Sequence, residues 1–176
     1  MRLWIDRRAS PVGGLLILLD EAGQLRALDF DDHEARMHRL LRLHYDEVSI
    51  AGDVSACGVA DAMAAYFEGD FTRMEALAVT TGGTLFQRSV WQALPRIGAG
   101  CTKGYGELAT ELGRPSACRA VGLANGDNPV AIVLPCHRVI GKSGALTGYG
   151  GGLWRKRWLL DHEARHGLPA SLDRLI

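Results

Sequence analysis

Cys136 and His137 place a thiol and an imidazole side by side, and they are the residues of this chain best suited to chemistry. A free thiol is only a few per cent thiolate at neutral pH, so a nucleophilic cysteine needs a partner that accepts its proton, and His137 is the obvious candidate. The apolar run 130–134 comes directly before Pro135 and predicts a buried strand that ends at the pair. The alternative is that Cys136 is one more small buried hydrophobe and His137 a surface residue.

The composition sets wide limits on the class of protein. The chain has 176 residues, of which 47% are hydrophobic and 23% charged, as is ordinary for a soluble globular protein of one or two small domains. The longest aliphatic stretch near the start, 15–19, is ended by Asp20 and Glu21, so it is too short for a membrane span or a signal peptide. We therefore expect no membrane association and a cytoplasmic location.

The spacing of cysteines and histidines disfavours disulfide bonds and metal sites. Four cysteines stand far apart without a CxxC pair, which favours reduced thiols; they are Cys57, Cys101, Cys118 and Cys136. His33, His38 and His44 are separated by five and six residues, so they do not share one helical face. We expect no metal and no other cofactor.

The zero net charge hides an asymmetry between the two halves of the chain. Residues 1–83 carry 8 basic and 14 acidic side chains, whereas residues 84–176 carry 12 basic and 6 acidic ones. A basic second half could face a polyanion such as DNA, and such binding would weaken with salt. The alternative is that unequal solvated charges fell there by chance.

The first half reads as a small mixed sheet-and-helix domain, residues 1–79. Residues 15–19 and 25–30 predict two strands joined by a turn, and therefore a hairpin. Helical spacing follows over 32–45, and again over 59–67. Nothing in this half indicates a reaction.

A Gly- and Thr-rich linker, residues 80–85, leads to a second domain, residues 86–176. A helix is expected directly after the linker. Two more helices, over 105–112 and 117–125, flank a turn, and Ser116 is placed to cap the second of them. This spacing predicts a helix-turn-helix.

The second helix of that motif carries small side chains on most of its surface, with Arg119 as its only long polar residue. Reading the major groove of DNA normally requires several long polar side chains, so sequence-specific recognition is improbable. A slim helix with one arginine suits the minor groove, where the arginine could enter the base stack. Tight packing against another helix explains the small residues equally well.

Several motifs of the second half closely resemble those of the O6-alkylguanine-DNA alkyltransferases, also called methylated-DNA–protein-cysteine methyltransferases. In chain order they are Tyr105-Gly106-Glu107-Leu108-Ala109, Arg119-Ala120-Val121-Gly122, Asn128-Pro129, Pro135-Cys136-His137-Arg138-Val139-Ile140, Thr147-Gly148-Tyr149-Gly150-Gly151-Gly152 and Trp158-Leu159-Leu160-Asp161-His162-Glu163. The first half matches the family only in layout and lacks the zinc-binding set of some members. The resemblance implies an α/β (α+β) fold whose mostly helical C-terminal domain carries a winged helix-turn-helix-like motif.

The resemblance also implies a mechanism. Cys136 would take an alkyl group from O6-alkylguanine, and from O4-alkylthymine, in double-stranded DNA, irreversibly and once per molecule. His137 would act as base toward Cys136 through a water, and Glu163 would hold the imidazole in the right tautomer. Asn128 would brace the active-site backbone. Tyr105 would serve as general acid toward the departing guanine and help to rotate the nucleotide out of the duplex.

Two sets of contacts follow from the same resemblance. The residues implied to touch DNA are Tyr105, Arg119, Ala120 and Gly122, with Arg119 filling the place of the flipped nucleotide. The residues implied to form the base pocket are Pro135, Val139, Tyr149, Gly150 and Gly151, with Tyr149 stacking on the base. Gly150 stands where some relatives have serine, so a more open loop that tolerates bulkier alkyl groups is a hypothesis. We expect a monomer, with cooperative binding along DNA left open, and assign no role to Cys101.

Two rival functions differ from alkyl transfer in class. One is a DNA-damage binder without a reaction, but relatives of that kind replace the cysteine, and Cys136 is present. The other is a thiol hydrolase that uses Cys136 and His137, which would need an oxyanion site and many turnovers.

Overall fold

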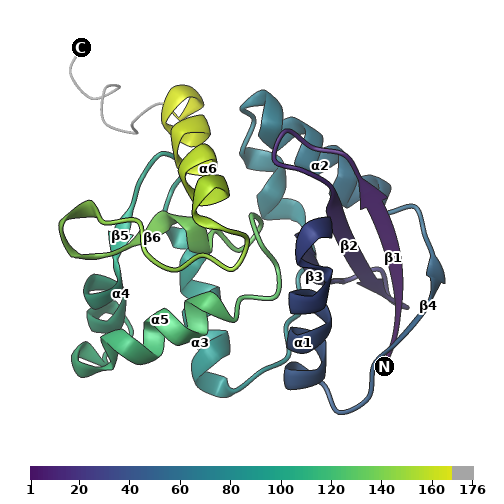
Figure 1. Cartoon of the computed structure of the whole chain (residues 1–176), viewed down its shortest axis with the longest axis horizontal. Coiled ribbons are helices and arrows are strands. Elements are labelled where there is room, and N and C mark those ends of the chain that lie inside the picture. Colours follow the sequence, from purple (N-terminus) through teal and green to yellow (C-terminus); the bar gives the residue numbers. More distant parts are fainter. Residues whose placement is uncertain (168–176) are drawn as a thin grey trace.

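The computed structural model describes residues 1–167, and its two halves lie side by side (Figure 1). The strands are β1 (Arg2–Arg8), β2 (Leu15–Asp20), β3 (Leu25–Phe30), β4 (Ser49–Asp53), β5 (Lys103–Gly104) and β6 (Val139–Ile140). The helices are α1 (Glu34–His44), α2 (Cys57–Glu68), α3 (Leu85–Ala93), α4 (Tyr105–Glu111), α5 (Cys118–Gly126) and α6 (Leu153–His166). Short 3-10 turns connect several of them. The last residues of the predicted second domain, 168–176, lie outside the described part.

The N-terminal half is a four-stranded sheet in the order β3-β2-β1-β4. The predicted hairpin is confirmed: β2 pairs antiparallel with β3, and Leu15 lies opposite Phe30. β1 pairs antiparallel with β2 and parallel with β4. The sequence did not reveal β1 or β4, because charged residues interrupt the apolar pattern of β1 and every residue of β4 is exposed.

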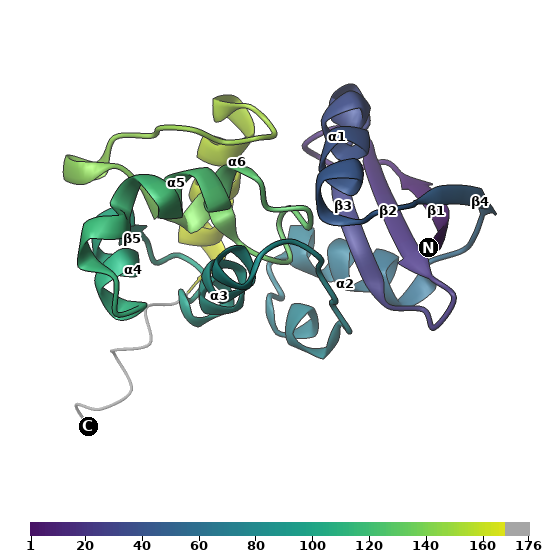
Figure 2. The ribbon, with the colours of Figure 1, turned by 90° about the horizontal axis from the view of Figure 1, so that it is seen from below.

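Both faces of this sheet are covered, because successive side chains of a strand point to opposite faces. Leu16 and Leu18 of β2 belong to a cluster with Met37 and Leu41 of α1. Leu15 and Ile17 face the other way, into a cluster that also holds α2 and much of the C-terminal half. Figure 2 shows α1 and α2 on opposite sides of the strands. Both predicted helices are therefore confirmed.

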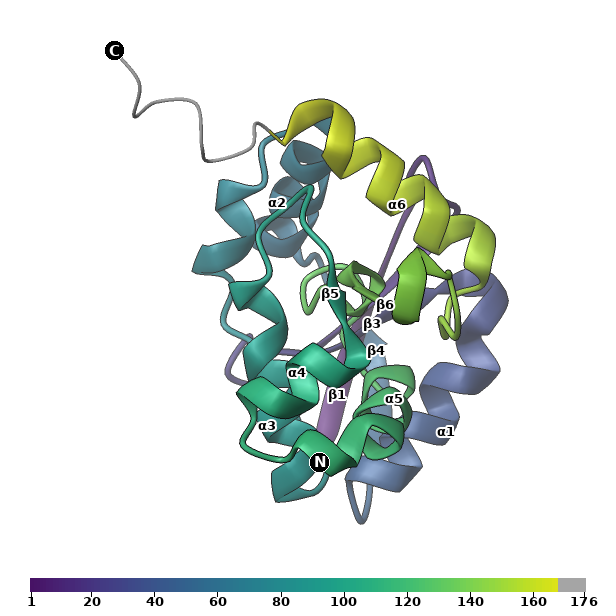
Figure 3. The same ribbon diagram turned by 90° about the vertical axis from the view of Figure 1, so that its left-hand side faces the viewer.

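The helix-turn-helix is also confirmed, as α4 and α5. Figure 3 shows these two helices side by side in the lower part of the view, away from α6. The indole Nε1 of Trp91 on α3 donates to the carbonyl of Ala124 at 2.8 Å, which fixes α5 against α3. The predicted cap at Ser116 is wrong. A 3-10 turn over Pro115–Ala117 precedes α5, and Ala117 occupies the N-cap without a side-chain hydrogen bond, so Ser116 lies inside that turn.

The predicted buried strand over 130–134 is wrong as well. The segment is buried, but it folds as a turn in which the amide of Leu134 donates to the carbonyl of Val130 at 3.0 Å. Ile132 has a φ of 68°, a left-handed conformation that a β-branched residue rarely adopts. An apolar run predicts that a segment is buried, but it does not by itself distinguish a strand from a buried turn.

The two halves share one hydrophobic cluster that contains Leu28, Tyr66, Trp91 and Val130. Backbone hydrogen bonds cross between them, since the amide of Leu28 donates to Pro129 at 3.0 Å and that of Ala131 donates to Leu28 at 2.8 Å. Within residues 1–167, no helix is long and apolar enough to cross a membrane.

Candidate active site

A short parallel pairing brings the helix-turn-helix to the segment of Cys136. β5 pairs with β6, so that Lys103 lies opposite Val139 and Gly104 opposite Ile140. Tyr105 follows Gly104 directly as the first residue of α4, and Cys136 lies three residues before Val139. Two motifs more than thirty residues apart in the sequence therefore meet at one place.

Cys136 is buried, with 4% of its surface exposed, in a 3-10 turn that it forms with His137 and Arg138. Burial raises the pKa of the Cys136 thiol, because a thiolate loses its hydration there. The side chain of Asn128 and the positive charges of Arg36 and Lys156 act in the opposite direction without cancelling it. The thiol of the free protein therefore keeps its proton at neutral pH and needs a base.

His137 and Glu163 form a fully buried pair, with His137 Nε2 2.8 Å from Glu163 Oε1. Burial raises the pKa of Glu163, but hydrogen bonds from His137 and Arg138 outweigh that effect and hold the pKa well below its usual range. An ionised carboxylate only accepts hydrogen bonds, so Nε2 carries the imidazole proton and Nδ1 carries a lone pair. Nδ1 is buried and has no hydrogen-bond partner among the described residues.

The same carboxylate binds three further groups that the sequence did not assign. Arg138 donates from Nε to Oε2 at 2.9 Å and from Nη2 to Oε1 at 2.8 Å. The hydroxyl of Tyr66, on α2 in the N-terminal half, donates to Oε1 at 2.8 Å. The amide of Gly100 donates to Oε2 at 3.2 Å. Arg138 stands beside the Cys-His pair, so its opposite charge to Glu163 was a usable signal, whereas Tyr66 looked like an ordinary core residue.

Two buried asparagines hold the backbone around Cys136. The amide of Asn128 donates to the carbonyl of Leu134 at 2.7 Å, and its oxygen accepts from Val130 at 3.0 Å. These bonds close the turn that leads to Cys136, as expected for Asn128. Asn125, near the end of α5, donates to the carbonyl of Cys136 at 3.1 Å and was not anticipated.

Tyr105 and Lys156 meet the loop that follows β6. The Tyr105 hydroxyl donates to the carbonyl of Thr147 at 3.1 Å. Lys156 is fully buried and donates to Thr147 at 2.9 Å and to the carbonyl of Val139 at 2.7 Å. Burial lowers the pKa of Lys156 to about 8. A cavity of about 470 Å³ lies beside Tyr105, bounded by Cys118 and the segment 140–144.

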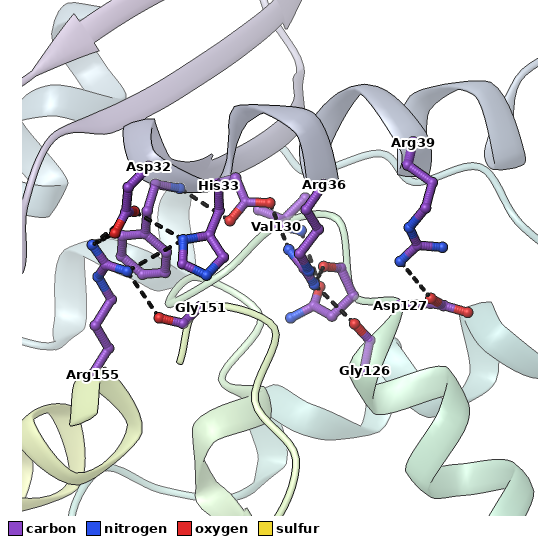
Figure 4. A network of polar contacts seen from close by, with 12 residues as sticks. Asp32, His33, Arg36, Arg39, Gly126, Asp127, Val130, Gly151 and Arg155 are labelled. Atoms are coloured by element: carbon purple, nitrogen blue, oxygen red, sulfur yellow. Dashed lines mark hydrogen bonds and ion pairs between the residues drawn. The ribbon is translucent and has the colours of Figure 1, made fainter. Parts of the chain in front are cut away.

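The Gly-rich loop of the expected base pocket lies against the N-terminal half. Burial raises the pKa of Tyr149 well above its ordinary value, and its buried hydroxyl has no partner among residues 1–167. Arg155 on α6 donates to the carbonyl of Gly151 at 2.9 Å and binds both carboxylate oxygens of Asp32 at 2.9 Å (Figure 4). The loop is thus tied to the end of the N-terminal sheet.

The residues expected to touch DNA lie on the helix-turn-helix: Tyr105 begins α4, and Arg119, Ala120 and Gly122 lie on α5. Arg119 and Ala120 are exposed, and Gly122 is half-buried beside the ring of Tyr105. Nothing covers Arg119 in the described structure, so a duplex could approach this end of the helix. Within residues 1–167, no three His, Cys, Asp or Glu side chains gather closely enough to hold a metal ion.

Comparisons of the sequence with known proteins show which family the chain belongs to. Residues 85–165 match the family model of the 6-O-methylguanine DNA methyltransferase, DNA binding domain. A methylated-DNA–protein-cysteine methyltransferase of Salmonella typhimurium is 48% identical over 165 residues, which cover 93% of this chain and 96% of that protein. The chain belongs to the methylated-DNA–protein-cysteine methyltransferases.

Solved structures of this methyltransferase family show the same fold. The O6-methylguanine methyltransferase of Mycobacterium tuberculosis is 40% identical, with a TM-score of 0.77 over 97% of both chains. Mycobacterium tuberculosis OGT in complex with DNA gives the same identity and TM-score over 97% of this chain and 96% of that one. The predicted family and fold class are confirmed, and the roles of single residues stay predictions.

Proposed function

We propose that this methyltransferase repairs O6-alkylguanine, and O4-alkylthymine, in DNA by moving the alkyl group onto Cys136. The observation that carries this proposal is the buried pair formed by Glu163 on α6 and His137, the residue that follows Cys136 in the chain. The pair leaves Nδ1 of the imidazole as an acceptor that has no hydrogen-bond partner among residues 1–167. Because burial also lowers the pKa of His137, the imidazole is neutral and able to accept a proton at neutral pH.

The transfer balances without any further reagent. The Sγ–carbon bond forms while the bond between that carbon and guanine O6 breaks, and the electron pair stays on the guanine. The thiol proton leaves to His137, directly or through a water, and the guanine ring gains one proton from Tyr105. The tyrosinate then takes a proton back from solvent and the imidazolium of His137 gives its proton up to solvent, so that the net change moves one proton from sulfur to guanine. The products are a neutral thioether and unmodified guanine. Because a thioether is not reversed by this chemistry, each molecule acts once.

The burial of Cys136 means that the damaged base must come to the sulfur. A guanine inside a duplex cannot reach it, so the nucleotide must be flipped out, at a cost of a few kcal/mol that is smaller where alkylation weakens the pair. Arg119, which is exposed near the start of α5, would fill the gap that the flipped nucleotide leaves. We expect base entry to break the contact between Tyr105 and Thr147. The protein would act as a monomer on DNA, in the cytoplasm.

The test is to mix the protein with a duplex that contains one O6-methylguanine, and to map the methyl group by peptide mass spectrometry. We expect one methyl group per protein, on Cys136, and none after Cys136→Ser. Cys57→Ser is the matched control and should transfer normally, since Cys57 is exposed on α2. Tight binding with Cys136 unmodified would indicate a damage binder, and repeated turnover with Cys136 unmodified would indicate a hydrolase.

A further inference from the structure

The space beside Gly150, in the loop of the base pocket, is filled by a side chain from the other half of the molecule. A Cβ at Gly150 would lie 2.3 Å from Cζ, Nε and Nη2 of Arg36. Arg36 belongs to α1, and Figure 4 shows it reaching from that helix toward the C-terminal half. The missing side chain of Gly150 therefore does not leave an open gap.

Arg36 is held firmly where it is. Its Nη1 lies 2.5 Å from Oδ2 of Asp29, a carboxylate with 1% of its surface exposed. Its Nη2 donates to the carbonyls of Gly126 at 2.8 Å and Asn128 at 3.1 Å. Swinging the guanidinium away would leave Asp29 buried and unpaired, which is costly.

The guanidinium contacts two segments of the site. It donates to the carbonyl of Asn128, the residue whose side chain closes the turn before Cys136, and it occupies the position that a Cβ of Gly150 would take. The next residue repeats the pattern, because a Cβ at Gly151 would lie 2.3 Å from the ring of Phe30. The positive charge of Arg36 also acts on Cys136, where it lowers the pKa of the thiol.

We propose that Arg36 is a specificity-determining residue, which limits the size of the O6-alkyl group that the pocket accepts by filling the space beside Gly150. This inference rests on the proposed function. It reverses the expectation that a glycine at position 150 opens the pocket. A guanidinium held by a buried carboxylate is also a poor neighbour for a large apolar substituent, because it cannot leave its partner to make room.

The experiment compares two variants that differ only in the volume at position 36. Both carry Asp29→Asn, so that no buried carboxylate is left unpaired. One has Arg36→Ala, which opens the space, and the other has Arg36→Met, which refills it with an uncharged chain. Single-turnover rates are measured on duplexes with one O6-methylguanine or one O6-benzylguanine. We expect the benzyl-to-methyl rate ratio of the alanine variant to exceed that of the methionine variant by about 10-fold or more.

Equal ratios in the two variants would overturn the proposal, whatever their absolute rates. A loss of positioning alone would slow both variants on both duplexes and leave the ratios alike. Arg39→Ala is the control on the same helix, because Arg39 is exposed and binds Asp127, and it should keep the wild-type ratio. If the double variants do not fold, Arg36→Lys keeps the charge near Asp29, occupies less of the space, and should raise the ratio by a smaller factor; an unchanged ratio there contradicts the proposal.

The outcome is separable from the proposed function. If wild-type protein leaves Cys136 unmodified with both duplexes, alkyl transfer itself is wrong. If wild type methylates Cys136 and the ratio does not respond to the volume at position 36, only the role of Arg36 is wrong.

Discussion

The C-terminal half contributes Cys136, His137 and Glu163, the groups to which we assign the reaction, whereas we assign none to the N-terminal half. The N-terminal half instead places Tyr66 on the carboxylate of Glu163 and Arg36 against the pocket loop. The groups assigned to the reaction gather in a short stretch and its facing helix. Some of the groups that hold them are neighbours, such as Arg138 and Asn128, and others come from distant parts of the chain. Mutations in the N-terminal half can therefore change how the reacting groups are positioned without removing any of them.

The largest effect is expected where the two halves meet, at Glu163→Gln. This change leaves Arg138 buried without its anionic partner, which should lower the free energy of unfolding by about 3–5 kcal/mol. It also removes the acceptor that fixes the His137 tautomer, so methyl transfer should slow by about 10²-fold or more. Urea unfolding and single-turnover kinetics measure the two effects.

The matched control for that change is Asp161→Asn, which makes the same carboxylate-to-amide change at an exposed position of the same helix. It should alter stability by about 0.5 kcal/mol or less. If Glu163→Gln behaved like this control, the buried pair would have no part in the reaction.

A smaller effect, confined to the C-terminal half, is expected for Arg119→Ala. Transfer from duplex should slow by roughly 10–100-fold, since flipping costs a few kcal/mol that the arginine helps to offset. Transfer from the free base O6-methylguanine should stay within about 2-fold, because no flipping is needed. Arg73→Ala, which removes an exposed charge in the N-terminal half, should leave both rates unchanged. Equal losses on duplex and free base would contradict the role of Arg119.

The smallest effect is expected for Asp32→Asn in the N-terminal half. Asp32 is half-exposed, and burial raises its pKa, but hydrogen bonds from His33 and Arg155 outweigh this and lower it. The folded-state pKa lies below the unfolded one, so the contribution of this carboxylate is present above pH 4 and is lost as pH falls through the lowered pKa. We expect a loss of about 1 kcal/mol or less at pH 7, and the difference from wild type should vanish in acid. A difference that persists at low pH in thermal unfolding would show another cause.

The groups assigned to the reaction could be proposed from the sequence because each is a chemically distinctive residue in a compact motif of the family. The helix-turn-helix and the hairpin of β2 and β3 follow from local pattern, whereas the pairing of His137 with Glu163 was implied only by the resemblance to the family. Asn128 was expected to brace the backbone, and its hydrogen bonds do so.

The aligning groups could not be predicted in the same way. Tyr66 sits on the buried face of an amphipathic helix, where a tyrosine looks like core, and its partner is 97 residues away. Arg36 lies on a helix whose other charges are solvated, so nothing local marks it as inserted beside Gly150. The run 130–134 was misread as a strand because burial by distant elements, rather than strand pairing, makes it apolar.

The central claim is that Tyr66, from the N-terminal half, sets the pKa of His137, the general base in the C-terminal half, through their shared partner Glu163. The substitution Tyr66→Phe tests this claim most directly. Removing the hydroxyl frees Glu163 Oε1 to accept more strongly from His137, which raises the pKa of His137. Because only neutral imidazole accepts the thiol proton, the acid limb of the rate–pH profile should move to higher pH. Tyr45→Phe, which removes a hydroxyl that accepts from Gly82, is the control and should leave the limb in place.

The measurement is the single-turnover rate of methyl transfer to Cys136 from pH 5 to 9 at saturating duplex. The account predicts a higher midpoint for the acid limb in Tyr66→Phe than in wild type or Tyr45→Phe. A loss of stability of about 1 kcal/mol should accompany it. The same stability loss with an unmoved acid limb would contradict the claim, because Tyr66 would then support the fold and not the base.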